Sequence, residues 1–138
     1  MGVYTGIAQD NVTINSGRAT LQSLTVTGAL TASGGLRVPV AAVAAAGSTQ
    51  SNAAALSEGL NVVSAADGTK GVVLPTAVAG MVVIVKNTAG AALKIYPATG
   101  GTVNALSANA AYSITNLTST LLVASSATQW YSVPLVAS

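Results

Sequence analysis

Few side chains in this sequence could perform acid–base or metal chemistry. The chain contains no histidine and no cysteine, and its only carboxylate side chains are Asp10, Glu58 and Asp67. Histidine is the usual general base near neutral pH and the commonest metal ligand, while cysteine is needed for disulfides and thiolate metal sites. A glycosidase requires two facing carboxyl groups, but Glu58 and Asp67 each precede a glycine, which is typical of turns. We therefore expect a protein that is not an enzyme and that uses no cofactor or metal.

Four aromatic side chains could serve either as a sugar-binding platform or as packing material. Tyr96, Tyr112, Trp130 and Tyr131 lie in the C-terminal part of a chain without phenylalanine, so they are also the largest available fillers of a core or an interface. We favour packing. If Trp130 and Tyr131 share a strand, they point to opposite faces. One is then expected inside, and the other at a contact with another chain.

The composition predicts a protein surface that faces other protein molecules. The chain is 51% hydrophobic and only 6% charged, with a net charge of +2, whereas ordinary globular proteins carry about 25% charged residues. Its five lysines and arginines are scattered singly, which argues against nucleic-acid binding. The longest apolar runs, such as 38–46 and Met81–Val85, fall far short of the ~20 residues of a membrane-spanning helix. We expect neither nucleic acid nor a membrane as partner.

A six-residue repeat organises the N-terminal segment. Leucine recurs at Leu24, Leu30 and Leu36, and an apolar residue follows two positions after each. Six is an even number and far from a multiple of 3.6, so the repeat favours extended backbone over a helix. Such short repeats have too little bulk to bury their apolar edge alone, and we interpret them as a thin β-arm completed by symmetry-related copies. A glycine- and threonine-rich linker of strands and turns is the alternative.

The arm and the late aromatic pair supply the candidate interface residues. Counting back in sixes gives Arg18, which breaks the repeat, and then Val12, with Ile14 two positions later. The predicted contacts with other copies or with a capsid are Val12, Ile14, Leu24, Val26, Leu30, Leu36, Val38, Trp130 and Tyr131.

Three parts are predicted: an extended N-terminal arm over residues 1–40, a linker over 41–59 and a β-domain over 60–138. Alanines around 41–55 favour a helix, but Gly47 interrupts them, so we expect extended stretches and at most one short helical turn. From Leu60 onwards, short apolar runs alternate with Gly, Asn and Pro. Strands are predicted at 60–64, 72–74, 81–85, 92–96, 102–104, 112–114, 120–124 and 129–133.

Strands at this short, regular spacing predict an all-β fold, with a C-terminal β-sandwich or barrel and an extended N-terminal β-arm that carries the hexad repeats. Asn87–Gly90 is expected to be a hairpin connection. The continuous run Met81–Val85 is expected to be a central strand, with Met81 and Ile84 in the core.

Short elements rich in glycine, alanine and threonine are spread over the rest of the chain: Gly47–Gln50, Gly71–Pro75, Ala79–Gly80, Val85–Leu93, Tyr96–Gly101, Asn104–Leu106 and Trp130–Tyr131. Through them, the segment from Gly47 to Tyr131 resembles a β-domain common in virion proteins of tailed bacteriophages, especially small head-decoration (cement) proteins and parts of fibres. The Leu-Thr-Val-Thr-Gly hexads resemble stalk or arm segments of trimeric phage fibres.

Such proteins are usually homotrimers, and decoration proteins sit on the outer capsid surface at three-fold or quasi-three-fold positions. The resemblance therefore implies a virion structural protein: a homotrimeric capsid decoration (cement) protein that binds the major capsid protein on the outside of a phage head and stabilises it. One alternative is a trimeric tail or head fibre component, which the length of the arm would suit. A carbohydrate-binding module built on the aromatic residues is the other.

Overall fold

The structure of the protein is a computed structural model that describes residues 25–31 and 34–135. The chain divides into two units, Met1–Gly35 and Leu36–Ser138. In the first unit, residues 25–31 form neither helix nor strand. Three of the predicted interface residues, Val12, Ile14 and Leu24, lie outside the described residues.

Strands make up the second unit, and the all-β prediction is confirmed. The described residues contain no α-helix, and their one helical segment is the 3₁₀ turn η1 (Gln50–Asn52). The strands are β1 (Val40–Ala44), β2 (Ala54–Ala55), β3 (Gly59–Ser64), β4 (Gly71–Val73), β5 (Val82–Asn87), β6 (Leu93–Tyr96), β7 (Thr102–Val103), β8 (Tyr112–Ile114), β9 (Ser119–Ala124) and β10 (Gln129–Leu135). Every strand predicted from residue 60 onwards is present, with its ends shifted by at most two residues.

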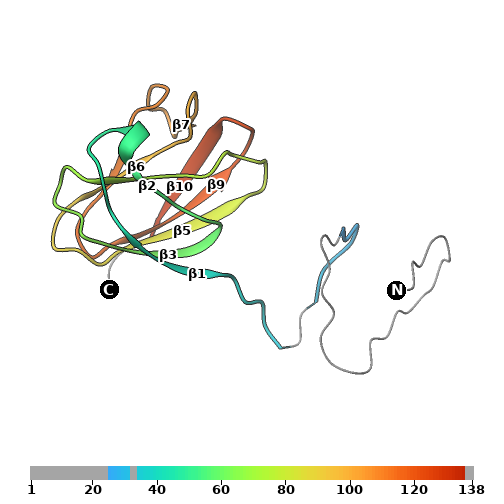
Figure 1. Cartoon of the computed structure of the whole chain (residues 1–138). Helices are drawn as coiled ribbons and strands as arrows, with labels where there is room; N and C mark the ends of the chain where they lie inside the picture. Colours follow the sequence, from blue (N-terminus) through green and yellow to red (C-terminus); the bar gives the residue numbers. More distant parts are fainter. Residues whose placement is uncertain (1–24, 32–33, 136–138) are drawn as a thin grey trace, which may run out of the picture. The chain divides into compact units, whose positions relative to one another are not determined.

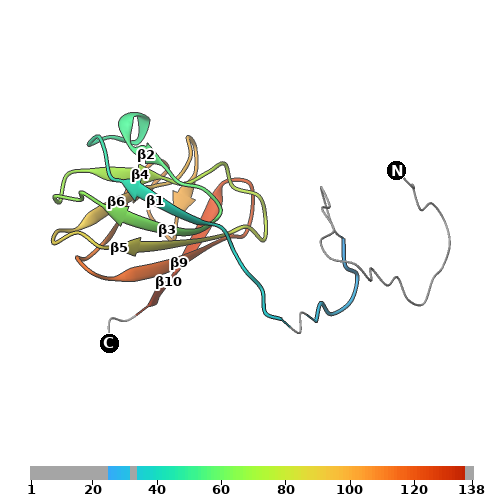
Figure 2. The same cartoon turned by 60° about the horizontal axis from the view of Figure 1, so that its bottom comes forward.

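The strands form two sheets. One has six strands in the order β1-β3-β5-β9-β10-β7, and the other has four in the order β2-β4-β6-β8 (Figures 1 and 2). The first six strands alternate between the sheets, so β1, β3 and β5 stack in parallel in one sheet while β2, β4 and β6 do so in the other. The chain therefore winds through three successive coils, as in a β-solenoid. Strands β8 and β9 then run antiparallel to β6 and β5 and end the coiling.

This winding differs from the expected sandwich or barrel. The turn Asn87–Gly90 does not make a hairpin, because β5 and β6 belong to different sheets. It carries the chain across the core, and each of the first six strands pairs with a strand one full coil away, as Leu60 does with Ile84. The apolar pattern of a strand is the same in both arrangements. This pattern therefore predicts where a strand lies in the sequence but not which strand it pairs with.

Residues 41–59, predicted to be a linker, supply most of the first coil. Strand β1 pairs with β3 over its whole length, and β2 pairs with β4. The turn η1 between them is the one short helical turn expected here. The alanines of β1 have little intrinsic strand preference, and pairing with β3 decides their conformation. The chain divides after Gly35 rather than at residue 40.

A glycine joins the first coil to the second. Gly59 has a φ of +87°, and a Cβ at this position would collide with the carbonyl oxygen of Pro39. That oxygen accepts a hydrogen bond from the backbone N–H of Leu60 at 2.9 Å. A residue with a side chain would lose this close approach, so the join requires glycine.

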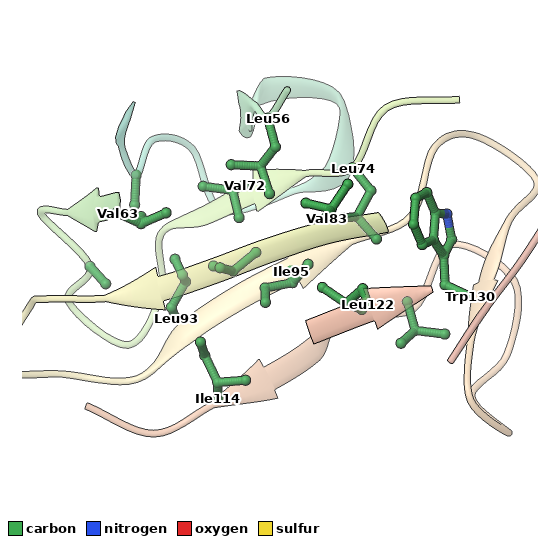
Figure 3. Close-up of a cluster of buried hydrophobic side chains, with 14 of the residues drawn as sticks. Leu56, Val63, Val72, Leu74, Val83, Leu93, Ile95, Ile114, Leu122 and Trp130 are labelled. Carbon is green, nitrogen blue, oxygen red and sulfur yellow. The ribbon is translucent and has the colours of Figure 1, made fainter. Parts of the chain in front are cut away.

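The core lies between the two sheets (Figure 3). Val83 and Val85 of β5 are fully buried, and so are Leu93 and Ile95 of the facing sheet. Trp130 of β10 packs at one end of this cluster (Figure 3). Successive side chains of a strand alternate between its two faces, and the alternation is regular along β5.

The same alternation corrects the predicted core. Ile84 lies between the inward-pointing Val83 and Val85, so its side chain points to the outer face and is only half-buried. Met81 precedes β5 and packs at the margin of the core. A continuous β-branched run is apolar on both faces, and the sequence alone therefore could not say which face is inside.

Buried polar side chains hold the turns. Asn87 is fully buried, and its Nδ2 donates to the carbonyl oxygens of Ala91 at 2.8 Å and Thr115 at 3.1 Å. Its Oδ1 accepts a hydrogen bond from the backbone N–H of Ala89 at 3.0 Å. In the part of the chain that the structure describes, every buried side-chain nitrogen and oxygen has a hydrogen-bond partner.

Candidate assembly surface

An apolar row crosses the outer face of the six-stranded sheet. The pairing register places Val40, Leu60, Ile84, Leu121 and Val133 side by side on five neighbouring strands. All five side chains point away from the core. Val40 and Val133, at the two ends, are 68% and 51% exposed, and the three between them are half-buried. A sheet with one face in water normally carries polar residues there, so this row is unusual for an isolated chain.

The rows on either side are also largely apolar. They consist of Val82, Val123 and Tyr131 on one side and of Ala42, Val62, Lys86 and Ser119 on the other. We name these three rows the outer face. Lys86 is the only charged residue in them, and its Nζ donates to the carbonyl oxygen of Leu117 at 2.5 Å. The outer face therefore offers other molecules an almost uncharged surface.

Sequence reasoning missed the outer face, although a signal was present. The stretches 82–85 and 121–123 are apolar at consecutive positions, whereas a strand with one wet face alternates apolar and polar residues. Strands that are apolar on both sides are typical of sheets covered on both sides. Here the covering on one side comes from the core, and the described residues leave the other side open.

The outer side of the four-stranded sheet is different, because the chain itself covers part of it. The ring of Tyr96 lies over Gly71, where a Cβ would come within 2.7 Å of it. Its hydroxyl donates to the carbonyl oxygen of Ser48 at 2.8 Å. Gln50 of η1 donates through Nε2 to the carbonyl oxygen of Pro97 at 2.6 Å. In Figures 1 and 2, η1 lies on the side of this sheet away from the six-stranded sheet.

The aromatic pair divides as predicted. Trp130 is 1% exposed and opposes Ala124 on the core side, whereas Tyr131 is 53% exposed on the outer face. Tyr131 therefore remains a candidate contact, and Trp130 is a core residue rather than a surface one. Tyr96 is buried and Tyr112 packs against the core, so neither ring is presented as a flat platform for a sugar.

The described interface candidates of the arm are all exposed. They are Val26, Leu30, Leu36 and Val38. Leu30 and Leu36 are the most exposed of them, at 64% and 79%. Single exposed leucines are common, but a repeated row of them is what an arm that contacts another chain requires.

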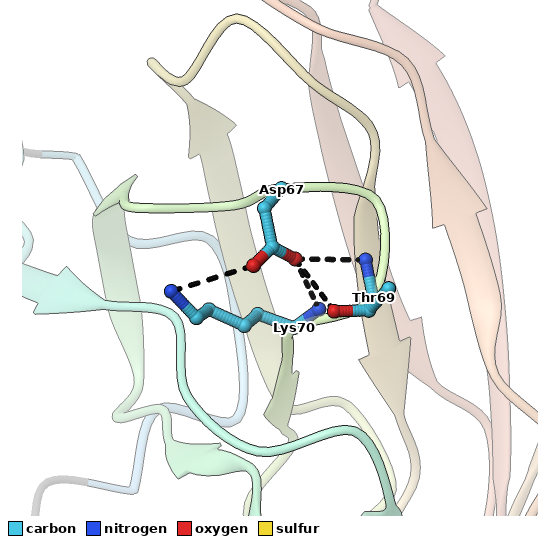
Figure 4. Close-up of polar contacts among 3 residues, drawn as sticks. All are labelled: Asp67, Thr69 and Lys70. Carbon is cyan, nitrogen blue, oxygen red and sulfur yellow. Dashed lines mark hydrogen bonds and ion pairs between the residues drawn. The ribbon is translucent and has the colours of Figure 1, made fainter.

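The carboxylate of Asp67 is occupied by its own turn (Figure 4). Oδ1 accepts hydrogen bonds from the backbone N–H groups of Lys70 and Thr69, both at 2.9 Å, and from the Thr69 hydroxyl at 2.7 Å. The Nζ of Lys70 lies 3.4 Å from Oδ2. These contacts, the Lys70 N–H above all, hold the pKa of Asp67 well below its ordinary value. A carboxyl group that stays ionised cannot donate a proton near neutral pH, so Asp67 serves the turn. Glu58 is exposed.

A cavity of about 270 Å³ opens beside Trp130, with Thr76, Thr99 and Thr128 in its lining. The lining has hydroxyl groups but no charged side chain. Among the described residues, no cluster of histidine, cysteine, aspartate and glutamate is suited to hold a metal ion. None of the described helical segments has the length and apolar character to cross a membrane.

Comparison with known proteins gives no match, whether to a protein-family model, to a curated protein or to a solved structure. The functional interpretation therefore depends on the chemistry of the outer face and of the arm.

Proposed function

We propose that this chain is a virion structural protein: a homotrimeric capsid decoration (cement) protein that binds the major capsid protein on the outer surface of a phage head. The observation that carries the proposal is the outer face, on a chain of which only 6% is charged. The largest contiguous apolar patch on a protein surface is often a functional site, and protein association is one such function. The choice of a phage head as the partner rests on the resemblance of the segment from Gly47 to Tyr131.

The size of the outer face favours several linked contacts over one strong contact. Five strands about 4.8 Å apart, with two or three outward residues on each, make a face of roughly 400 Å². A stable complex buries about 800 Å² on each partner, so one outer face alone suits a weak contact. Three copies in a trimer would present three such faces together, and contacts linked in this way strengthen each other.

The proposed mechanism is mechanical. Burial of the outer face against neighbouring capsid subunits contributes about 25 cal/mol per Å² of apolar area before ordering costs are subtracted. A trimer that bridges several subunits in this way resists their separation when packaged DNA pushes the shell outward. No reaction is required, which suits a chain without histidine or cysteine.

The test is binding of the full-length protein to undecorated phage heads, followed by cryo-electron microscopy. Tyr131→Glu adds a charge to the outer face and is expected to weaken binding more than about tenfold, because the charge would have to be desolvated. Ser113→Glu is the matched control, since Ser113 is exposed on β8 of the other sheet, and it should bind like the unmodified protein. Equal binding by both variants, or density only on the tail, would contradict the proposal.

A fibre component is the second candidate, and one observation favours it. The coils of the second unit stack in parallel, and elongated proteins are built by continuing such stacks. The number of copies per virion distinguishes the two functions. Hundreds of copies support decoration of the head, and a handful supports a fibre.

A further inference from the structure

The first coil has an open edge in both sheets. Within the described residues, β1 ends the six-stranded sheet and β2 ends the four-stranded sheet. The N–H of Leu60 donates to Pro39 at 2.9 Å, and the N–H of Ala45 donates to Ser64 at 2.8 Å. In a parallel pair, alternate residues of a strand bond to the same neighbour. The odd-numbered residues of β1 therefore bond to β3.

The even-numbered residues of β1 direct their backbone groups the other way. Val40, Ala42 and Ala44 present three N–H donors and three carbonyl acceptors along an edge beside which the structure describes no strand. Natural proteins usually protect such edges with charges, prolines or a covering segment. Strand β1 reads Val-Ala-Ala-Val-Ala and has no charge or proline. A stack of coils also requires a cap at its end, so this edge is suited to receive another strand.

The segment that leads into β1 has matching chemistry. Its hexads place a leucine and a second apolar residue two positions apart, as in Leu36 and Val38, so an extended strand carries both on one face. Arg37 is the only charged residue in 24–40. Leu30 and Leu36 are exposed. A nearly uncharged segment, whose apolar residues would share one face if it formed a strand, thus precedes an uncharged edge at which the apolar row begins.

We propose that the hexad segment 24–38 of a second copy of this chain pairs with β1 and extends the six-stranded sheet. The chain's own segment is poorly placed to do this in parallel, because parallel neighbours need a crossover of about a dozen residues, whereas Pro39 joins the hexads directly to β1. Each copy has one hexad segment and one β1 edge. Head-to-tail exchange gives a closed ring where the rotation between copies closes, and a trimer is such a ring.

This inference goes beyond the proposed function, since it states how copies join and needs no capsid. The test is amide hydrogen exchange on the full-length protein in solution, read residue by residue. If the hexads pair with β1, the amides of Val40, Ala42 and Ala44 should exchange about 100-fold more slowly than those of unpaired chain. They should lose this protection on dilution to monomer, while Ala41 and Val43 keep theirs.

Two outcomes of the exchange experiment would overturn the inference. If the even-numbered amides exchange like unpaired chain in an intact oligomer, the copies join elsewhere. If their protection survives in the monomer, the chain's own segment covers the edge. Neither result bears on whether the protein binds phage heads. Failure of this inference is therefore distinguishable from failure of the proposed function.

A matched pair of variants gives a second, independent readout. Ala42→Pro removes an N–H that points away from β3, and edge strands tolerate proline at such positions. We expect the dissociation constant of the oligomer to rise about tenfold, because one hydrogen bond between copies is lost. Ala42→Thr keeps the N–H and should assemble normally. Assembly of Ala42→Pro at the unmodified level would contradict the proposal, and if that variant fails to fold, the exchange experiment decides alone.

Discussion

Single polar side chains hold the connections between coils. Asn87 bonds three backbone groups from within the core, Asp67 bonds the turn between β3 and β4, and Tyr96 reaches the loop before η1. Each replaces hydrogen bonds that backbone groups would otherwise make with water. Turns that cross from one sheet to the other have no ladder of their own, so these side chains set their shape.

Replacement of Asn87 by alanine should destabilise the fold by about 1–3 kcal/mol, because the carbonyl groups of Ala91 and Thr115 would be left without this partner. Urea unfolding followed by the fluorescence of Trp130, the only tryptophan, measures the change. Asn116→Ala, at an exposed asparagine in the β8–β9 loop, is the control and should change little. Equal stability of both variants would show that Asn87 is not needed for the turn.

The low pKa of Asp67 predicts a loss of stability in acid. In the unfolded chain an aspartate titrates near 3.9, and in the folded chain the pKa lies well below that value. The stabilisation is therefore fully present above about pH 5 and is lost as the pH falls towards the folded pKa. Thermal unfolding between pH 6 and pH 2 measures it. Asp67→Ala should melt lower at pH 6 and lose part of the acid dependence, and an unchanged profile would contradict the assigned role.

At the scale of elements, adjacent residues of β5 have different roles, because one side chain serves folding and the next serves assembly. Val85 points into the core and Ile84 points to the outer face. Val85→Asp should prevent folding, because it buries an unpaired charge in a domain whose total stability is only about 5–15 kcal/mol. Ile84→Asp should keep the circular dichroism and tryptophan emission of the unmodified protein. If both variants unfold alike, the outer face is packed against something within the chain.

The positions of the strands could be predicted from the sequence, whereas their partners could not. Runs such as 119–124 are recognisable by local composition and by the turns that bound them. Pairing partners depend on whether a turn reverses the chain within a sheet or carries it across the core, and Asn87–Gly90 carries no residue that distinguishes the two. The sequence predicts a linker at the alanines of β1 for a related reason, since only pairing with β3 makes them a strand.

The candidate site was predicted in part. The opposite orientation of Trp130 and Tyr131 followed from the two-residue period of a strand. The outer face could not be predicted in this way, because its rows join residues from five strands. How those strands align with one another cannot be read from any single stretch of sequence.

At the scale of the whole molecule, assembly should depend on the arm while folding should not. Leu30→Asp places a charge at the leucine position of a hexad and is expected to abolish oligomer formation, because the charge would have to be desolvated between chains. The second unit should remain folded. Thr31→Asp, at the next position and on the other side of an extended strand, should assemble normally. Light scattering measures the size of the oligomer, and circular dichroism measures folding. An oligomer of normal size from Leu30→Asp would show that the arm is not needed for assembly.

The place of β9 beside β5 also has a consequence during synthesis. A ribosome adds about 5–20 residues per second, so a nascent chain waits for some seconds with its third coil made but the neighbour of β5 still missing. Until residues 119–124 emerge, the side of β5 away from β3 has no partner from its own chain. Such a nascent chain exposes an unpaired apolar strand edge that is prone to aggregation, and chaperone protection during this interval would raise the amount of mature protein that a cell obtains.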